Sequence, residues 1–147
     1  MDIMTDNQRD KLNRFLAEKV IGIVVGKIEV LNDRYPYGYR LDNADGTPYA
    51  YPGGGLHGWG YQHSEDAAWF YCPKFCTSWA DCEPLLDKIE RDGWKWDWDN
   101  FDDRYTFEVM KDCDNGPNEN SLVFHASSKT RTEALCLAIA RCYGWKV

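Results

Sequence analysis

Residues 84–99, PLLDKIERDGWKWDWD, decide the fold, because the hydrophobic period changes within this one stretch. Leu85 and Ile89 lie four positions apart, which is the spacing of the apolar stripe of a helix. Gly93 follows, and glycine readily takes the positive φ that is common just past a helix end. The tryptophans of Trp94–Trp98 then alternate with polar residues, which is the period of a strand with one buried face. The stretch therefore predicts a helix that ends on a glycine and leads directly into a strand.

The same signals predict further helices and strands on both sides of this stretch. Thr5 with Gln8, and Thr130 with Glu133, match the capping box that begins many helices. Alternating or β-branched runs elsewhere are typical of strands. Helices are expected at 5–22, 82–92 and 130–144, and strands at 23–31, 67–72, 94–101, 104–111 and 122–127.

Pro84 limits where the middle helix can begin, because proline has no backbone N–H and clashes with the preceding turn. We expect a turn at 78–82, with Pro84 in the first turn of the helix that follows. The last three strands include a hairpin, so they are largely antiparallel. The element order predicts an α+β fold: a central, mostly antiparallel sheet of about five strands, flanked by three helices in an α/β/α sandwich-like arrangement.

One segment, residues 32–63, differs in kind from the rest of the chain. It combines three prolines, the glycine run at 53–55 and many aromatic residues, so we expect a long loop insertion, with one short hairpin around Asp45-Gly46 as an alternative within it. A long irregular segment inside a compact domain is usually functional or mobile. The length of 147 residues predicts a single domain over 1–147, with a short tail at 1–5.

Charge and composition exclude several classes of protein. A formal net charge of −7 argues against nonspecific binding to nucleic acid or to an anionic membrane, since such proteins carry basic contact faces. No apolar run approaches the length of a membrane span. The first residues lack the basic and apolar regions of a secretory signal, so a cytoplasmic location is expected. The six cysteines then indicate reduced thiols rather than a disulfide framework.

Two motifs were weighed as metal or phosphate sites. Thiolates are common zinc ligands, and the candidates are Cys72, Cys76, Cys82 and Cys113. Their spacing does not match a zinc knuckle, so buried reduced cysteines are favoured and no metal or cofactor is expected. The glycine run lacks the Gly-Lys-Ser/Thr ending of a phosphate-binding loop, which excludes that motif.

A ligand site is instead expected around the glycine-rich loop. Rings of Tyr and Trp on glycine hinges suit stacking on a ligand or a partner, because they bury large areas at small entropic cost. Rings that simply fold onto the sheet are an equally weighted alternative. The expected ligand-binding residues are Tyr49, Tyr51, His57, Trp59, Tyr61, Arg40 and Arg104. The cations that could hold a phosphate are Arg34, Arg40, Lys74, Arg104 and Arg131.

The order of these elements resembles the small phage proteins called phage ABA sandwich domains. The resemblance is carried by four segments: Leu16–Gly22, Thr77–Trp79, Leu85–Trp94 and Thr132–Ala140. The long insertion at 35–63 and Pro84 within the second helix depart from the family pattern. The resemblance implies a phage- or prophage-encoded accessory protein with helices flanking a sheet, and it assigns no catalytic residues.

Three functions follow as hypotheses. The favoured one is a binding protein, plausible in counter-defence inside the host cytoplasm, that sequesters a nucleotide-like ligand or blocks a host protein and forms a homo-oligomer. The second is a hydrolase that uses Asp97, Asp99, Asp102 or His125, since paired carboxylates can perform acid–base chemistry. The third is an acidic mimic, which the 17 Lys and Arg residues interspersed among 24 acids make less favourable.

Overall fold

The chain forms two compact units. We call Met1–Leu16 with Lys74–Val147 the terminal unit, because it contains both ends of the chain, and Ala17–Pro73 the inner unit. The computed structural model describes residues 4–29, 34–49, 61–101, 103–111 and 122–146. Within these residues, no helix is both long and apolar enough to cross a membrane. A division into compact units does not test whether they fold together, so the single domain over 1–147 stays a prediction.

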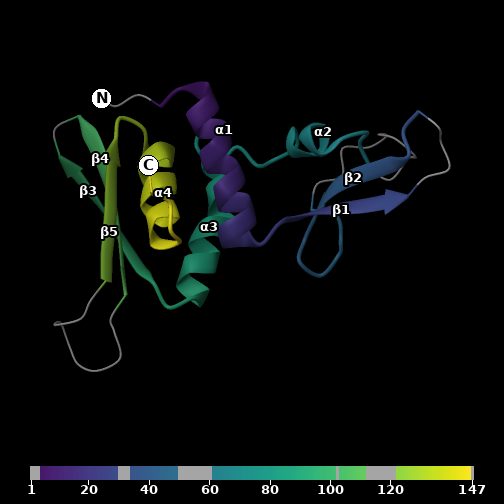
Figure 1. Cartoon of the computed structure of the whole chain (residues 1–147). Coiled ribbons are helices and arrows are strands. Elements are labelled where there is room, and N and C mark those ends of the chain that lie inside the picture. The colour runs from purple at the N-terminus through teal and green to yellow at the C-terminus, as the bar shows by residue number, and fades with distance from the viewer. Residues whose placement is uncertain (1–3, 30–33, 50–60, 102, 112–121, 147) are drawn as a thin grey trace. The chain divides into compact units, whose positions relative to one another are not determined.

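The terminal unit contains a three-stranded antiparallel sheet with the order β3-β4-β5 (Figure 1). Its strands are β3 (Lys95–Phe101), β4 (Arg104–Lys111) and β5 (Leu122–Ser128). Trp98 lies opposite Phe107, which in turn lies opposite Ala126. Phe107 and Ala126 are buried, whereas Asp97 and Asp99, on either side of Trp98, are exposed. The hairpin and the antiparallel run predicted from the alternating pattern are therefore confirmed.

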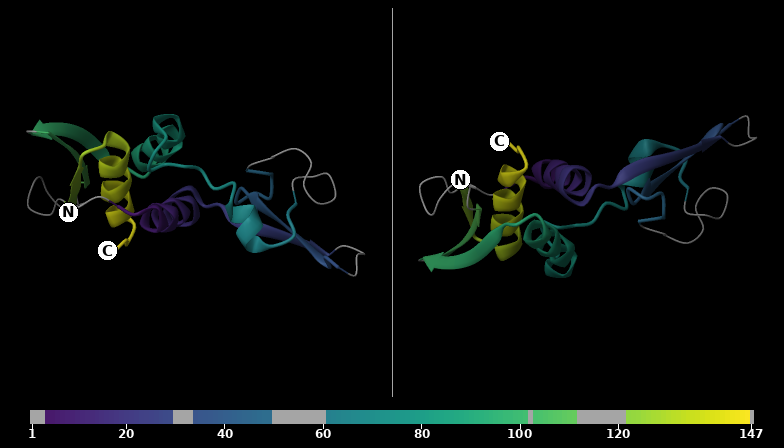
Figure 2. Two further views of the ribbon diagram at one scale, coloured as in Figure 1. Left: turned by 90° about the horizontal axis from the view of Figure 1, so that it is seen from above. Right: turned by 90° about the horizontal axis from the view of Figure 1, so that it is seen from below.

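Three helices of the terminal unit lie on the same side of this sheet (Figure 2). They are α1 (Asp6–Phe15), α3 (Trp79–Arg91) and α4 (Arg131–Cys142). Helix α4 packs directly on β4 and β5, and α1 and α3 pack against α4. The largest buried side chains between them include Leu12, Phe75, Leu85, Ile89, Phe107, Val109, Leu135 and Ile139. The α+β class is thus confirmed, with the helices on one face of this sheet.

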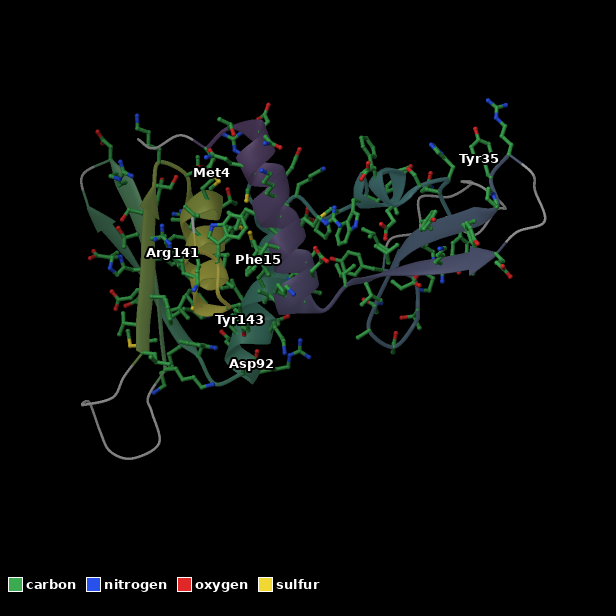
Figure 3. All side chains as sticks on the ribbon, in the orientation of Figure 1. Met4, Phe15, Tyr35, Asp92, Arg141 and Tyr143 are labelled. Atoms are coloured by element: carbon green, nitrogen blue, oxygen red, sulfur yellow. The ribbon has the colours of Figure 1, made fainter. Side chains whose placement is uncertain are left out.

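Polar and aromatic contacts join the ends of these helices (Figure 3). The rings of Phe15 and Trp145 meet edge to face at 5.1 Å. The Tyr143 hydroxyl donates a hydrogen bond of 2.5 Å to Asp92 at the end of α3. This bond lowers the pKa of Asp92, while burial and the neighbouring carboxylate raise the pKa of Tyr143. The end of α3 is thereby connected to the end of α4.

Helix α3 begins earlier than the sequence predicts. It starts at Trp79, with the Ser78 hydroxyl as N-cap acceptor for the Asp81 N–H, so the predicted turn at 78–82 is wrong. Pro84 lies inside the helix, where it removes the N–H that would bond to the carbonyl of Ala80. Ala80 is exposed in the first turn, so its carbonyl can bond to water instead. Helix α3 therefore tolerates the proline, because the lost bond lies near the start of the helix, where the Ala80 carbonyl can reach water.

A wide helical turn leads from Leu16, the last residue of the first segment of the terminal unit, into the inner unit. The six residues η1 (Leu16–Ile21) form a π-helix that follows α1, and Gly22 closes it with a φ of 90°. The N–H groups of Gly22 and Ile23 both reach the carbonyl of Ala17, at 3.0 and 2.8 Å. The expected stop at Gly22 is confirmed, because only a residue without a Cβ adopts this φ easily.

A two-stranded antiparallel ribbon follows, made of β1 (Val24–Glu29) and β2 (Tyr37–Asp42). Strand β1 was predicted, but β2 falls inside the segment expected to be a loop, so that expectation is wrong for 37–42. Isolated bridges add Gln62 opposite Tyr39 and Pro48 opposite Asp42, and the second closes the short hairpin that the sequence offers around Asp45-Gly46. Among the residues that the structure describes, the five strands therefore belong to two sheets rather than to one central sheet.

The strand expected at 67–72 is also wrong. Glu65–Trp69 form the short helix α2, which accounts for a fourth helix beside the three expected. The Ser64 hydroxyl caps it by accepting from the Ala67 N–H at 3.1 Å. Two acids in the first turn, Glu65 and Asp66, complement the partial positive charge at the helix start. This local capping outweighs the strand preference of the aromatic residues that follow.

Candidate functional site

The candidate site is an open groove in the terminal unit, with a volume of about 400 Å³. It lies where the starts of β4, α3 and α4 come together. Its lining residues are Trp79, Tyr105, Lys129, Thr130, Arg131 and Thr132. The volume falls within the range of roughly 300–1,000 Å³ that is usual for small-molecule sites.

The turn into α4 forms one end of this groove, and buried polar contacts fix it. Strand β5 ends at Ser128, and the Thr130 hydroxyl then caps α4 by accepting from the Glu133 N–H at 3.3 Å. Ser128 is buried and donates to the Glu133 carboxylate at 3.2 Å. The helix start predicted at Thr130 is confirmed, although the Glu133 carboxylate binds Ser128 and Arg9 rather than the Thr130 backbone. Lys129, the turn residue between Ser128 and Thr130, is exposed.

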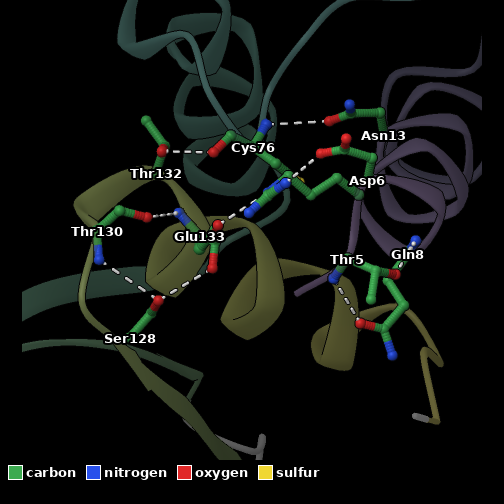
Figure 4. A network of polar contacts seen from close by, with 10 residues as sticks. Thr5, Asp6, Gln8, Asn13, Cys76, Ser128, Thr130, Thr132 and Glu133 are labelled. Carbon is green, nitrogen blue, oxygen red and sulfur yellow. Dashed lines mark hydrogen bonds and ion pairs between the residues drawn. The ribbon is translucent and has the colours of Figure 1, made fainter. Parts of the chain in front are cut away.

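A network of polar contacts connects this turn to the neighbouring helices (Figure 4). The Thr132 hydroxyl donates to the carbonyl of Cys76 at 2.6 Å, and the Cys76 N–H donates to the Asn13 side chain at 3.0 Å. Arg9 donates to Glu133 at 3.0 Å, and this hydrogen bond raises the pKa of Arg9. Cys76, Asn13 and Glu133 are buried, so the floor of the groove is held rigidly.

The cationic wall of the groove consists of Lys129 and Arg131. Both side chains are exposed. The Arg131 guanidinium lies over the Tyr105 ring, 5.4 Å from its centroid, which orients the cation without neutralising it. The first turn of α4 adds a partial positive charge to the same region. The groove is therefore locally cationic on a chain whose net charge is −7.

The aromatic wall of the groove consists of Trp79 and Tyr105. Trp79 is the first residue of α3 and is 48% exposed. Behind these two rings lies Trp98, at 6.0 Å from the Trp79 ring and 6.5 Å from the Tyr105 ring. Trp98 in turn contacts the buried Phe107 ring at 4.7 Å. The exposed Trp79 ring and the half-buried Tyr105 ring thus adjoin a series of aromatic contacts that reaches the core.

Three of the expected ligand-binding residues lie around β2 in the inner unit. The Arg40 guanidinium lies over the Tyr61 ring at 4.4 Å and binds the Asp42 carboxylate at 2.6 Å. The Arg40 and Asp42 side chains are only 11% and 9% exposed. Tyr49 is half-buried and is joined to β2 by its N–H, which donates to the carbonyl of Leu41 at 3.0 Å. The structure brings Arg40 and Tyr61 together, and it uses both to hold the ribbon.

The remaining expected residues belong to the other unit or lie outside the described residues. Arg104 belongs to the terminal unit, where its side chain reaches the Ser127 carbonyl at 3.5 Å. Strand alternation places Arg104 on the face opposite Tyr105, away from the groove. Tyr51, His57 and Trp59 lie outside the described residues. Of the five cations considered as phosphate ligands, Arg131 lines the groove.

The candidates for acid–base chemistry lie on the uncovered face of the sheet. Asp97, Glu108 and His125 form one cross-strand row, and Asp99 lies opposite Thr106 in the neighbouring row. Asp97, Asp99 and His125 are exposed, and none of them lines the groove. Asp102 lies outside the described residues.

The cysteines gather in the core rather than at a surface site. Cys76, Cys82 and Cys136 are buried in the terminal unit, and burial raises the pKa of the Cys136 thiol. Cys72 belongs to the inner unit, and Cys113 lies outside the described residues. Among the His, Cys, Asp and Glu side chains that the structure describes, no set of three or more is arranged to hold a metal ion.

Comparison with known proteins adds no relative: no family model, no curated protein and no solved structure matches this chain. The resemblance to phage ABA sandwich domains therefore stays a prediction.

Proposed function

We propose that this chain is a non-enzymatic binding protein that captures a small anionic ligand in the groove at the start of α4. The observation that carries the proposal is the presence of two exposed cations, Lys129 and Arg131, in a groove of about 400 Å³ on an acidic chain. Two aromatic side chains complete the walls. A few directed polar groups in a partly aromatic pocket are typical of a small-molecule site.

The charge distribution favours a small ligand over a polyanion. A net charge of −7 repels a long polyanion, whose phosphates extend well beyond the groove. A compact anion meets mainly the local cations, because charges more than about 8 Å apart are largely screened at physiological salt. The same balance argues against nucleic acid as a partner.

The lining favours binding over catalysis. The six lining residues include no carboxylate, imidazole or thiol that could act as acid, base or nucleophile. The hydroxyls of Thr130 and Thr132 accept from Glu133 and donate to Cys76 respectively, so they serve the helix start. The groove can hold and orient an anion, and in this proposal Lys129 serves as a point charge and Tyr105 as the ring beneath Arg131.

The wider role follows the favoured hypothesis from the sequence. A cytoplasmic phage protein that sequesters a small anion would lower its free concentration in the host and could act in counter-defence. An oligomer would present several grooves. A role in blocking a host protein is the alternative, and the outcome of the first experiment separates the two.

The first experiment is native mass spectrometry of the full chain purified gently from cell lysate. A stoichiometric adduct with the mass of a small anion supports the proposal and identifies the ligand. A second measurement, isothermal titration with inorganic pyrophosphate, compares the chain with Arg131→Gln and with Arg91→Gln, an exposed arginine of α3 outside the groove. We expect Arg131→Gln to weaken binding about tenfold or more, because it removes a charged hydrogen-bond donor.

Arg91→Gln should leave the affinity unchanged. Equal effects of Arg131→Gln and Arg91→Gln would show that pyrophosphate binding depends on overall charge, and would contradict the groove as the binding site. If native mass spectrometry finds no adduct and the chain also fails to bind pyrophosphate, small-anion capture is overturned and a protein partner is favoured.

A further inference from the structure

We infer that the ligand of the groove is a free nucleotide, with its phosphate at Lys129 and Arg131 and its base stacked on Trp79. The inference rests on the proposed function and names the chemical class of the ligand. It starts from the arrangement of two chemically different walls, one cationic and one aromatic, around a single groove.

The exposure of Trp79 is the first argument. An indole that is 48% exposed at the first position of α3 does little for the helix, whose start is fixed by the Ser78 cap. The ring is nevertheless held in place, because it rests against Trp98 at 6.0 Å. A fixed, half-exposed aromatic face is what a planar ring needs for stacking, and bases of every kind present such a face.

The orientation of Arg131 is the second argument. Its guanidinium carbon lies over the Tyr105 ring, 5.4 Å from the ring centroid. A guanidinium that stacks in this way keeps its N–H edge available for paired hydrogen bonds to phosphate oxygens. Lys129, two residues earlier in the same turn, adds a flexible point charge.

The two walls together select the ligand class. Inorganic phosphate would occupy the cationic wall and leave the aromatic wall unused. A neutral planar ring would occupy the aromatic wall and leave the cationic wall unused. A nucleotide carries a phosphate and a planar base in one molecule, so it can occupy both walls at once.

The size and charge of the site favour a free nucleotide over one within a strand. Proteins that bind single strands combine successive stacking rings with a basic path along the backbone. This groove offers two cations on a chain of net charge −7, which suffices for one phosphate group. A strand would bring further phosphates against an acidic surface.

The test is isothermal titration of the full chain with the four ribonucleoside 5′-monophosphates, with inorganic phosphate, and with adenosine. We expect at least one monophosphate to bind more than tenfold more tightly than either phosphate or adenosine alone. Trp79→Ala should weaken that nucleotide about tenfold and leave phosphate binding unchanged, since stacking acts on the base alone. Trp79→Tyr keeps a ring and should restore much of the affinity.

The matched control is Phe70→Ala, which removes another exposed aromatic ring, 73% exposed and in the inner unit. It should change neither affinity. If phosphate binds as tightly as every nucleotide and Trp79→Ala has no effect, the nucleotide inference is overturned while small-anion capture stands. If neither phosphate, pyrophosphate nor any nucleotide binds, the nucleotide inference and the proposed capture of a small anion are both overturned. Tighter binding of an eight-residue oligonucleotide than of the monophosphates would overturn the assignment to a free nucleotide.

Discussion

The terminal unit and the inner unit hold their strands by different interactions. In the terminal unit the sheet is covered by α4, and the contact is apolar: Phe107 and Val109 face Leu135 and Ile139, and all four are fully buried. In the inner unit α2 packs on β2 and Leu41 is buried, and cations also lie over rings: Lys27 of β1 over Tyr37 of β2, and Arg40, which pairs with Asp42 of its own strand, over Tyr61. Two-stranded ribbons have too little apolar surface to be stable by packing alone.

The difference changes how aromatic side chains should be interpreted. In the inner unit, Lys27 lies over Tyr37 at 4.0 Å and Arg40 lies over Tyr61 at 4.4 Å, so these rings serve the ribbon itself. In the terminal unit, Trp79 remains half-exposed beside two cations in a groove. A high aromatic content therefore marks a binding site only where the rings are not already used by the fold.

The largest expected effect concerns the apolar core of the terminal unit. Phe107 is fully buried and contacts the rings of Trp96 and Trp98 at 5.5 and 4.7 Å. Phe107→Ala should lower the free energy of unfolding by about 3–5 kcal/mol, because it removes a large buried ring and leaves a cavity. Urea unfolding followed by circular dichroism measures this loss. Val123→Ala, on the exposed side of β5, is the control and should cost less than about 1 kcal/mol; similar losses for both would contradict an apolar core at this position.

The second prediction tests whether an ion pair does in the inner unit what packing does in the terminal unit. A Cβ at Gly26 would lie 1.9 Å from Oδ2 of Asp42, so Gly26→Ala must move this carboxylate, whose Oδ1 binds Arg40. We expect a loss of about 2–3 kcal/mol, because a partly buried charge is left badly paired. Hydrogen exchange of the β1 and β2 amides should accelerate. Val24→Ala, at an exposed position of the same strand, serves as control, and unchanged exchange in Gly26→Ala would show that the pair contributes little.

The two units also differ in how far the sequence predicts them. The strict alternation of Trp94–Trp98 and the helical spacing after Thr130 produce elements whose buried faces are visible in the sequence, and both are confirmed. Strand β2 was missed because its Tyr and Gly composition is typical of a loop, and its pairing with β1 joins residues 8 to 18 positions apart in the chain. Helix α2 was missed because the cap at Ser64 is a single residue, whereas the aromatic run after it is long.

The candidate site, too, could be predicted only in part from the sequence. Arg131 was named among the cations that could bind a phosphate, and the helix start at Thr130 was predicted from its capping box. Trp79 and Lys129 were not selected, because nothing local shows that the start of α3 and the turn before α4 meet beside β4. Sequence patterns indicate which elements form, while a groove made from three of them requires the tertiary arrangement.

A smaller effect compares the helix caps of the two units. Thr130→Ala removes the acceptor for the Glu133 N–H, and Ser64→Ala removes the acceptor for the Ala67 N–H. Each should cost about 1 kcal/mol locally. Because α4 packs on the sheet, Thr130→Ala should lower global stability in urea unfolding. Helix α2 has only five residues, so Ser64→Ala should act mainly through faster hydrogen exchange of 64–70; a larger global loss for Ser64→Ala than for Thr130→Ala would reverse this comparison.

The smallest expected effect is a pH dependence located in the terminal unit. The hydrogen bond from Tyr143, followed by that from Lys88, lowers the pKa of Asp92 in the folded state. A carboxyl group with a lowered folded pKa contributes stability above its unfolded pKa of about 3.9, and the contribution is lost as the pH falls through the folded value. Tyr143→Phe removes the largest cause and should cost about 1 kcal/mol at pH 7.

That cost should shrink toward zero as the pH falls from about 5 to below 3, because a protonated Asp92 no longer gains from the tyrosine hydroxyl. Urea unfolding of both proteins across this range measures the change. Asp92→Asn provides the matched comparison, since it removes the titrating group but keeps a similar shape. In the Asp92→Asn background, Tyr143→Phe should have the same effect at every pH; a cost that still varied with pH there would place the titrating group elsewhere in the terminal unit.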